Sequence, residues 1–238
     1  MPLTSTFSTI AATQTAADKP LDTTLMDAMR QDIDVLYEWM GGPTYTPSTS
    51  HDHDGVNSRA VKSGLVFLAS ATASASATID FTSGLSTLYE DYEFHIFNAL
   101  PATDNDDLYL RVGTGVGPTY QTASYFWSAM AVDSTATEYN VAGENAAFVS
   151  LSGGGLVLNT AGEIGYNGVV RCFNPMSATV KKAFSYSGTL YGGNPDRLYT
   201  VRGGGAWQST SAVTAFRFLY SLGNVTSGRF FMYGVQKL

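Results

Sequence analysis

Two histidines separated by one residue are the first candidates for metal chemistry. His51 and His53 lie in the polar segment 51–58, which reads HDHDGVNS. In an extended segment, residues i and i+2 point to the same side, so the imidazoles would share one face roughly 7 Å apart. Two imidazoles do not close a metal shell, but three chains around an axis would supply six, which suits an octahedral transition-metal ion better than tetrahedral zinc. The alternative is that both are solvated loop side chains.

The segment before the histidines predicts a helix over residues 20–40 that could bring such chains together. Pro20 fits a first helical position, and Gly41-Gly42-Pro43 ends the helix. Two heptads are too short to be stable alone in water, so the apolar seam needs a partner. Copies of the same helix and the chain's own β domain are the two alternatives, and the broad apolar face favours a parallel trimer. The predicted trimerisation seam has heptad a/d spacing and consists of Met26, Met29, Ile33, Leu36 and Met40.

The chain from residue 65 to residue 238 predicts an antiparallel β-sandwich or jelly roll. Short alternating runs separated by Gly, Asn, Asp and Pro are typical of strands joined by turns. The absence of helical crossovers in the pattern favours antiparallel sheets. We therefore expect a mainly β protein with two domains: residues 1–64 form an N-terminal arm, the helix and a linker, and residues 65–238 form the head.

The C-terminal part of the head predicts a β-hairpin. Phe216, Phe218 and Tyr220 alternate along one strand, a turn follows at 223–228, and residues 229–235 return as the second strand. Consecutive short strands of this kind usually pair with each other.

Composition and charge exclude several classes of function. Only 14% of the residues are charged, a balance more typical of a β-rich extracellular or virion protein than of a cytosolic enzyme. With 13 Lys and Arg and a net charge of -7, the chain is a poor candidate for general nucleic-acid binding. Neither a membrane-spanning run nor a signal peptide is visible. The single cysteine, Cys172, excludes an intrachain disulfide framework. Serine nucleophile elbows, phosphate loops and dinucleotide fingerprints are all missing from the sequence, so we expect no enzyme.

The segment 51–61, His-x-His-Asp-Gly-x-Asn-Ser followed by an aliphatic position, resembles a segment that recurs in fibre and spike proteins of tailed bacteriophages. A looser likeness to phage structural proteins covers 79–127 and 216–235. The resemblance implies a homotrimer located in the virion, attached to other virion proteins through its N-terminus. It also implies iron or a similar transition-metal ion on the trimer axis, bound by His51 and His53.

A fibre head of this kind would attach the virion to a host-surface glycan or protein, with three identical heads providing avidity. Sugar-binding β-sandwiches often present exposed aromatic faces beside carboxylates, amides and arginines. The alternative is that the aromatics fill the core or a trimer interface. The candidate receptor-binding residues are Trp127, Tyr191, Asp196, Arg197, Tyr199, Arg202 and Trp207.

Two other functions stay open at this point. A capsid decoration or neck protein would use the same head to bind neighbouring virion proteins. A polysaccharide-cleaving spike would need two positioned carboxylates, which the sequence offers in no distinctive pattern.

Overall fold

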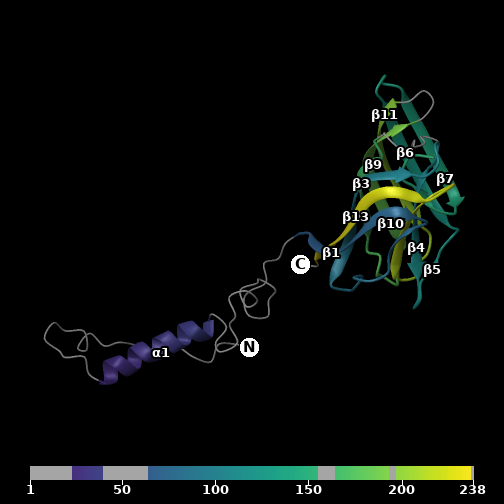
Figure 1. Cartoon of the computed structure of the whole chain (residues 1–238). Helices are drawn as coiled ribbons and strands as arrows, with labels where there is room; N and C mark the ends of the chain where they lie inside the picture. Colours follow the sequence, from purple (N-terminus) through teal and green to yellow (C-terminus); the bar gives the residue numbers. More distant parts are fainter. Residues whose placement is uncertain (1–22, 40–63, 155–163, 193–196, 237–238) are drawn as a thin grey trace. The chain divides into compact units, whose positions relative to one another are not determined.

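The computed structural model describes residues 23–39, 64–154, 164–192 and 197–236. The chain divides into two compact units, Met1–Lys62 and Ser63–Leu238. Figure 1 shows the helix of the first unit and the strands of the second. Among the described residues, no helix is long and apolar enough to cross a membrane.

The first unit contains one described helix, α1 (Thr23–Trp39). The expected N-terminal helix is therefore confirmed. Four residues of the predicted seam lie within it, and their side chains are 45–61% exposed: Met26, Met29, Ile33 and Leu36. Met40, the fifth residue of the seam, lies outside the described residues.

The second unit is built from antiparallel strands in two sheets, and the predicted β-sandwich class is confirmed. The eight-stranded sheet has the order β1-β13-β3-β9-β10-β11-β6-β7. Its strands are β1 (Val66–Ser76), β3 (Tyr89–Pro101), β6 (Tyr125–Asp133), β7 (Glu138–Ala146), β9 (Tyr166–Phe173), β10 (Lys182–Gly192), β11 (Arg197–Trp207) and β13 (Val225–Gln236). The smaller sheet has the order β2-β12-β4-β5, and β8 pairs with β4. Its strands are β2 (Ile79–Phe81), β4 (Leu108–Thr114), β5 (Thr119–Tyr120), β8 (Val149–Ser150) and β12 (Ala215–Tyr220).

Alternation along each strand sorts side chains between the core and the outer faces. Strand β6 is the clearest example, because its residues are buried and exposed in strict succession from Tyr125 to Asp133. The core between the sheets is largely aromatic. The ring of Phe94 on β3 lies 4.8 Å from that of Phe216 and 5.2 Å from that of Phe218, both on β12.

The predicted C-terminal hairpin is wrong. Strand β12 pairs with β2 and β4 in the smaller sheet, whereas β13 pairs with β1 and β3 in the larger one. Each of the two strands carries large apolar side chains on one face. Both apolar faces are buried when the strands belong to opposite sheets and face each other across one core. The rings of Phe218 and Phe230 accordingly meet across the core, with centroids 5.4 Å apart.

Glycines inside the larger sheet make room for the side chains of two buried tyrosines on neighbouring strands. A Cβ atom at Gly203 would lie 2.3 Å from Cζ of Tyr186, and one at Gly188 would lie 2.6 Å from Cζ of Tyr166. A side chain at either position would collide with the tyrosine unless its ring moved, which explains the glycines there. The lone cysteine, Cys172, is buried on β9, and burial raises the pKa of its thiol well above the usual value.

Candidate functional site

The outer face of the eight-stranded sheet carries the described residues best placed to bind a ligand. Strand register places two rows of outward-facing residues side by side across β3, β9, β10, β11, β6 and β7. The first row is His95, Val169, Ser187, Arg202, Met130 and Asn140. The second row is Glu93, Arg171, Ser185, Gly204, Ser128 and Ala142. Four neighbouring residues of the second row have small side chains, so the outer surface of the sheet is recessed there: Ser185, Gly204, Ser128 and Ala142.

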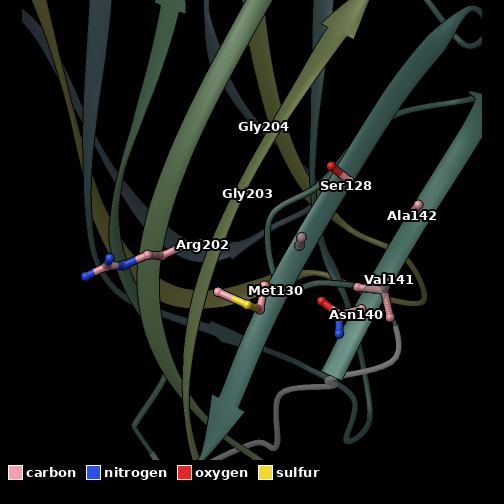
Figure 2. A pocket seen from close by; sticks show the side chains of 9 residues that line it. Ser128, Met130, Asn140, Val141, Ala142, Arg202, Gly203 and Gly204 are labelled. Carbon is pink, nitrogen blue, oxygen red and sulfur yellow. The ribbon is translucent and has the colours of Figure 1, made fainter. Parts of the chain in front are cut away.

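Two hollows lie along these rows and share Arg202 and Gly203. The larger, of about 470 Å3, lies over β11, β6 and β7. The smaller, of about 250 Å3, lies over β3, β9, β10 and β11. Figure 2 shows Met130 and Asn140 close together on β6 and β7, with Arg202 extending away from them. Because β10 is the other neighbour of β11, the guanidinium of Arg202 lies on the side of the smaller hollow.

The charged groups of this outer face differ in whether they already have a partner. Nη2 of Arg171 lies 2.6 Å from a carboxylate oxygen of Asp91, and His95 is 2.7 Å from Glu93. Arg202 is exposed and, in the described part of the chain, has no ion pair, side-chain hydrogen bond or aromatic contact. None of the other described side chains therefore occupies its five N–H donors.

An aromatic cluster occupies the other end of the same outer face. It consists of Phe67 on β1, Phe97 on β3, and Phe231 and Tyr233 on β13. The Phe67 ring lies 5.8 Å from Tyr233, and the Phe97 ring lies 5.6 Å from Phe231. Phe67 and Phe97 are 56% and 43% exposed. This end of the sheet is therefore more apolar than the end that carries the hollows.

The described members of the predicted receptor-binding set do not share one exposed surface. Trp127, Tyr199 and Trp207 are only 4–8% exposed and pack in the core, so they offer no open aromatic face. Alternation explains their burial, because each occupies an inward position of its strand. Tyr191 is partly exposed on β10, whereas Asp196 lies outside the described residues.

Arg197 has a structural partner. It pairs with Asp133, whose side chain is fully enclosed, while Thr135, Thr137 and Tyr139 also donate hydrogen bonds to that carboxylate. Arg197 therefore stabilises the turn between β6 and β7. Among the described members of the predicted set, only Arg202 is an exposed residue that lines the two hollows.

Acid should weaken this turn, and Asp133→Asn tests the expectation. Desolvation raises the pKa of Asp133, but hydrogen bonds from Arg197, Thr137 and Thr135 outweigh it and hold the pKa well below its usual value of 3.8. A carboxylate with a depressed pKa stabilises the folded state above its unfolded pKa, and that stability is lost as the pH falls through the folded pKa. We expect Asp133→Asn to unfold at lower urea concentration at pH 7 and to lose less stability than wild type between roughly pH 5 and pH 2.

Urea unfolding at several pH values measures the effect, and Glu138→Gln on the exposed side of β7 is the control. An acid dependence of Asp133→Asn identical to that of wild type would contradict this role for the carboxylate.

The predicted metal ligands, His51 and His53, lie outside the described residues. Within the described ranges, no group of three or more His, Cys, Asp and Glu side chains is arranged to hold a metal ion.

Sequence reasoning missed most residues that line the hollows, including Met130, Asn140 and Arg171. Their outward positions follow from strand alternation. Their proximity depends on pairing between strands that are distant in sequence. Comparison with family models, curated proteins and solved structures finds no match for this chain.

Proposed function

We propose that this chain is a structural protein of a virion: a homotrimeric tail or head fibre, or spike, whose β head attaches to a host-surface glycan. The observation that carries the trimer is the exposed apolar seam of α1. Met26, Met29, Ile33 and Leu36 follow heptad spacing and are about half exposed. Burying large apolar side chains stabilises an assembly by roughly 1.5–3 kcal/mol each when burial is complete.

Three features of the chain support association through the helix. Seventeen residues are marginal as an isolated helix in water, so helix formation and association stabilise each other. The described polar positions around the seam include Asp27, Gln31 and Asp34, which suit a solvated outer surface. The segment that resembles phage fibres begins at His51, C-terminal to the helix. In a trimer it would bring three copies of His51 and His53 together around iron or a similar metal ion.

The head supplies the receptor-binding part of the proposal. Its outer face has hollows lined by serine hydroxyls, an amide and the exposed guanidinium of Arg202, which are groups that hydrogen-bond to sugars. A site this open holds a single ligand weakly, and three heads on one axis would raise the effective affinity when they engage together. The N-terminal arm would attach the fibre to other virion proteins.

The substitution Ile33→Asp tests the seam. We expect wild-type protein to have a native mass of about 76 kDa, three times the 25.4 kDa chain, and Ile33→Asp to have the mass of one chain. The reason is that a carboxylate at a seam position would be buried without a partner in the trimer. Native mass spectrometry and light scattering measure this at low micromolar concentration.

Gln31→Asp is the matched control, because Gln31 is exposed on the side of the helix away from the seam. The control should keep the mass of the wild type. A monomeric wild-type protein would overturn the fibre proposal. A trimeric Ile33→Asp variant would mean that the helix seam does not hold the trimer together. Elemental analysis of the wild type, with its mass remeasured in chelator, tests the metal proposed at His51 and His53.

A second function, binding to neighbouring virion proteins as a decoration or neck protein, is favoured by the aromatic cluster. Phe67, Phe97, Phe231 and Tyr233 form a continuous apolar end of the outer face. Clustered exposed aromatics are enriched at protein–protein interfaces. Under this alternative, the head would bind virion proteins and no host saccharide.

A further inference from the structure

We propose that the outer-face hollows bind an acidic saccharide, with the guanidinium of Arg202 pairing with a carboxylate of the sugar chain. This inference rests on the proposed attachment to a glycan and names the class of glycan. It also names the residues that would recognise the ligand.

The position of Arg202 between the two hollows is the first argument. The larger hollow lies on its β6 and β7 side, and the smaller lies on its β10, β9 and β3 side. A ligand that occupies both must cross Arg202 and Gly203. Two neighbouring hollows that share lining residues suit consecutive units of an extended chain, which is the shape of a polysaccharide. The low surface at Ser185, Gly204 and Ser128 lets such a chain approach the sheet.

Among the described residues Arg202 has no carboxylate partner, whereas three other strand arginines do. Arg171 pairs with Asp91, Arg197 with Asp133 and Arg217 with Asp80. Arg217 shows how the fold holds a structural arginine: two of its nitrogens reach the two oxygens of Asp80 at 2.7 and 2.6 Å. Arg202 is exposed and has no such carboxylate in the described part of the chain. A planar guanidinium binds a carboxylate in this same two-pronged geometry. A carboxylate of a ligand could therefore accept two hydrogen bonds from Arg202.

The residues beside Arg202 carry groups that suit a saccharide. Ser187 on β10 and Met130 on β6 are the strand partners of Arg202, and Asn140 follows Met130 on β7. A hydroxyl and an amide can each donate and accept hydrogen bonds, which matches the hydroxyl and acetamido groups of sugars. The Met130 side chain is 48% exposed and offers an adaptable apolar contact for a sugar ring.

Charge at the far end of the smaller hollow orients the ligand. Glu93 lines that hollow and is bonded to His95, while Arg171 is already held by Asp91. A carboxylate on the ligand is repelled by Glu93 and attracted by Arg202, so it lies on the β11 side. Glu93 can still accept a hydrogen bond from a sugar hydroxyl.

The test uses the full-length protein and a glycan array of uronic-acid oligosaccharides, each printed beside its carboxyl-reduced neutral counterpart. We expect the protein to bind at least one acidic oligosaccharide. Its affinity for the carboxyl-reduced counterpart should be lower by about tenfold or more. Calorimetry with that oligosaccharide should then show a loss of about tenfold or more for Arg202→Ala, because a hydrogen-bonded charge pair is removed. Arg202→Lys should recover part of the affinity, since it keeps the charge and loses the two-pronged geometry.

Two further variants separate the site from general electrostatics and from misfolding. Arg229→Ala removes an equal charge from β13, where Arg229 lies over the ring of Phe97, and should leave the affinity unchanged. Ser128→Tyr fills the larger hollow while leaving Arg202 in place, and should weaken binding. All variants change outward side chains, so their thermal unfolding should match wild type.

The outcomes distinguish this inference from the function on which it rests. Equal binding of acidic and reduced partners, or unchanged affinity in Arg202→Ala, would overturn the acidic-saccharide site and leave glycan attachment standing. Equal losses in Arg202→Ala and Arg229→Ala would also overturn it, since diffuse charge would then explain the binding. Absence of binding to every saccharide on the array would overturn glycan attachment itself and favour the virion-protein alternative.

Discussion

Replacing Phe94 with alanine should lower the free energy of unfolding of the head by about 3–5 kcal/mol. The Phe94 side chain is fully buried. Its ring contacts the rings of Phe81, Phe216 and Phe218, with centroids 4.8–5.4 Å apart. These partners belong to β2 and β12 of the smaller sheet, so the substitution opens a cavity where the two sheets meet. Urea unfolding followed by far-UV circular dichroism measures the change.

Phe97→Ala is the matched control, because it removes the same side chain from the outer face of the same strand. Phe97 is 43% exposed and contacts Phe231 and Arg229, so we expect a loss well below that of Phe94→Ala. Equal losses for the two variants would mean that the space between the sheets is not the main core of the head.

Replacing Lys182 with methionine should lower the free energy of unfolding by at least about 2 kcal/mol. Lys182 is fully buried, and its Nζ donates to the carbonyl oxygens of Ser177, Val180 and Thr210 at 2.5, 2.7 and 3.2 Å. These carbonyls belong to the loop before β10 and the loop after β11. Methionine keeps the length of the side chain but leaves three part-buried acceptors without their donor. An unpaired acceptor costs about 1–3 kcal/mol where water does not replace the donor.

Lys181→Met provides the control from the neighbouring residue. Lys181 is exposed and bonds to Gln208 at the surface, so its loss should change stability by less than about 0.5 kcal/mol. Hydrogen exchange should also show faster opening of residues 177–180 in Lys182→Met. Unchanged stability and exchange would mean that the ammonium does not tie the two loops together.

Much of the fold could be predicted because its main signals are local. The alternation from Tyr125 to Asp133 is visible in the sequence, and the structure buries every second residue of that strand. The spacing of Met26, Met29, Ile33 and Leu36 predicted a helix, and α1 contains all four. Both predictions depend only on backbone geometry and on the separation of apolar from polar side chains within one segment.

The candidate site could not be predicted in the same way, because residue type does not determine which face a side chain occupies. Trp127, Tyr199 and Trp207 were chosen as aromatics, yet their inward positions bury them. Arg197 and Arg202 lie on one strand and are equally basic. Only the structure shows that Arg197 pairs with Asp133 while Arg202 faces the hollows.

By itself, the sequence of this protein determined the elements: one amphipathic helix and a long succession of alternating strands. The tertiary structure alone decided that β12 and β13 lie in opposite sheets and that Ser187, Arg202 and Met130 become neighbours. The physical reason is the range of the interactions. Hydrophobic periodicity acts over a few residues, whereas strand pairing is selected by how all strands together bury their apolar faces in one core.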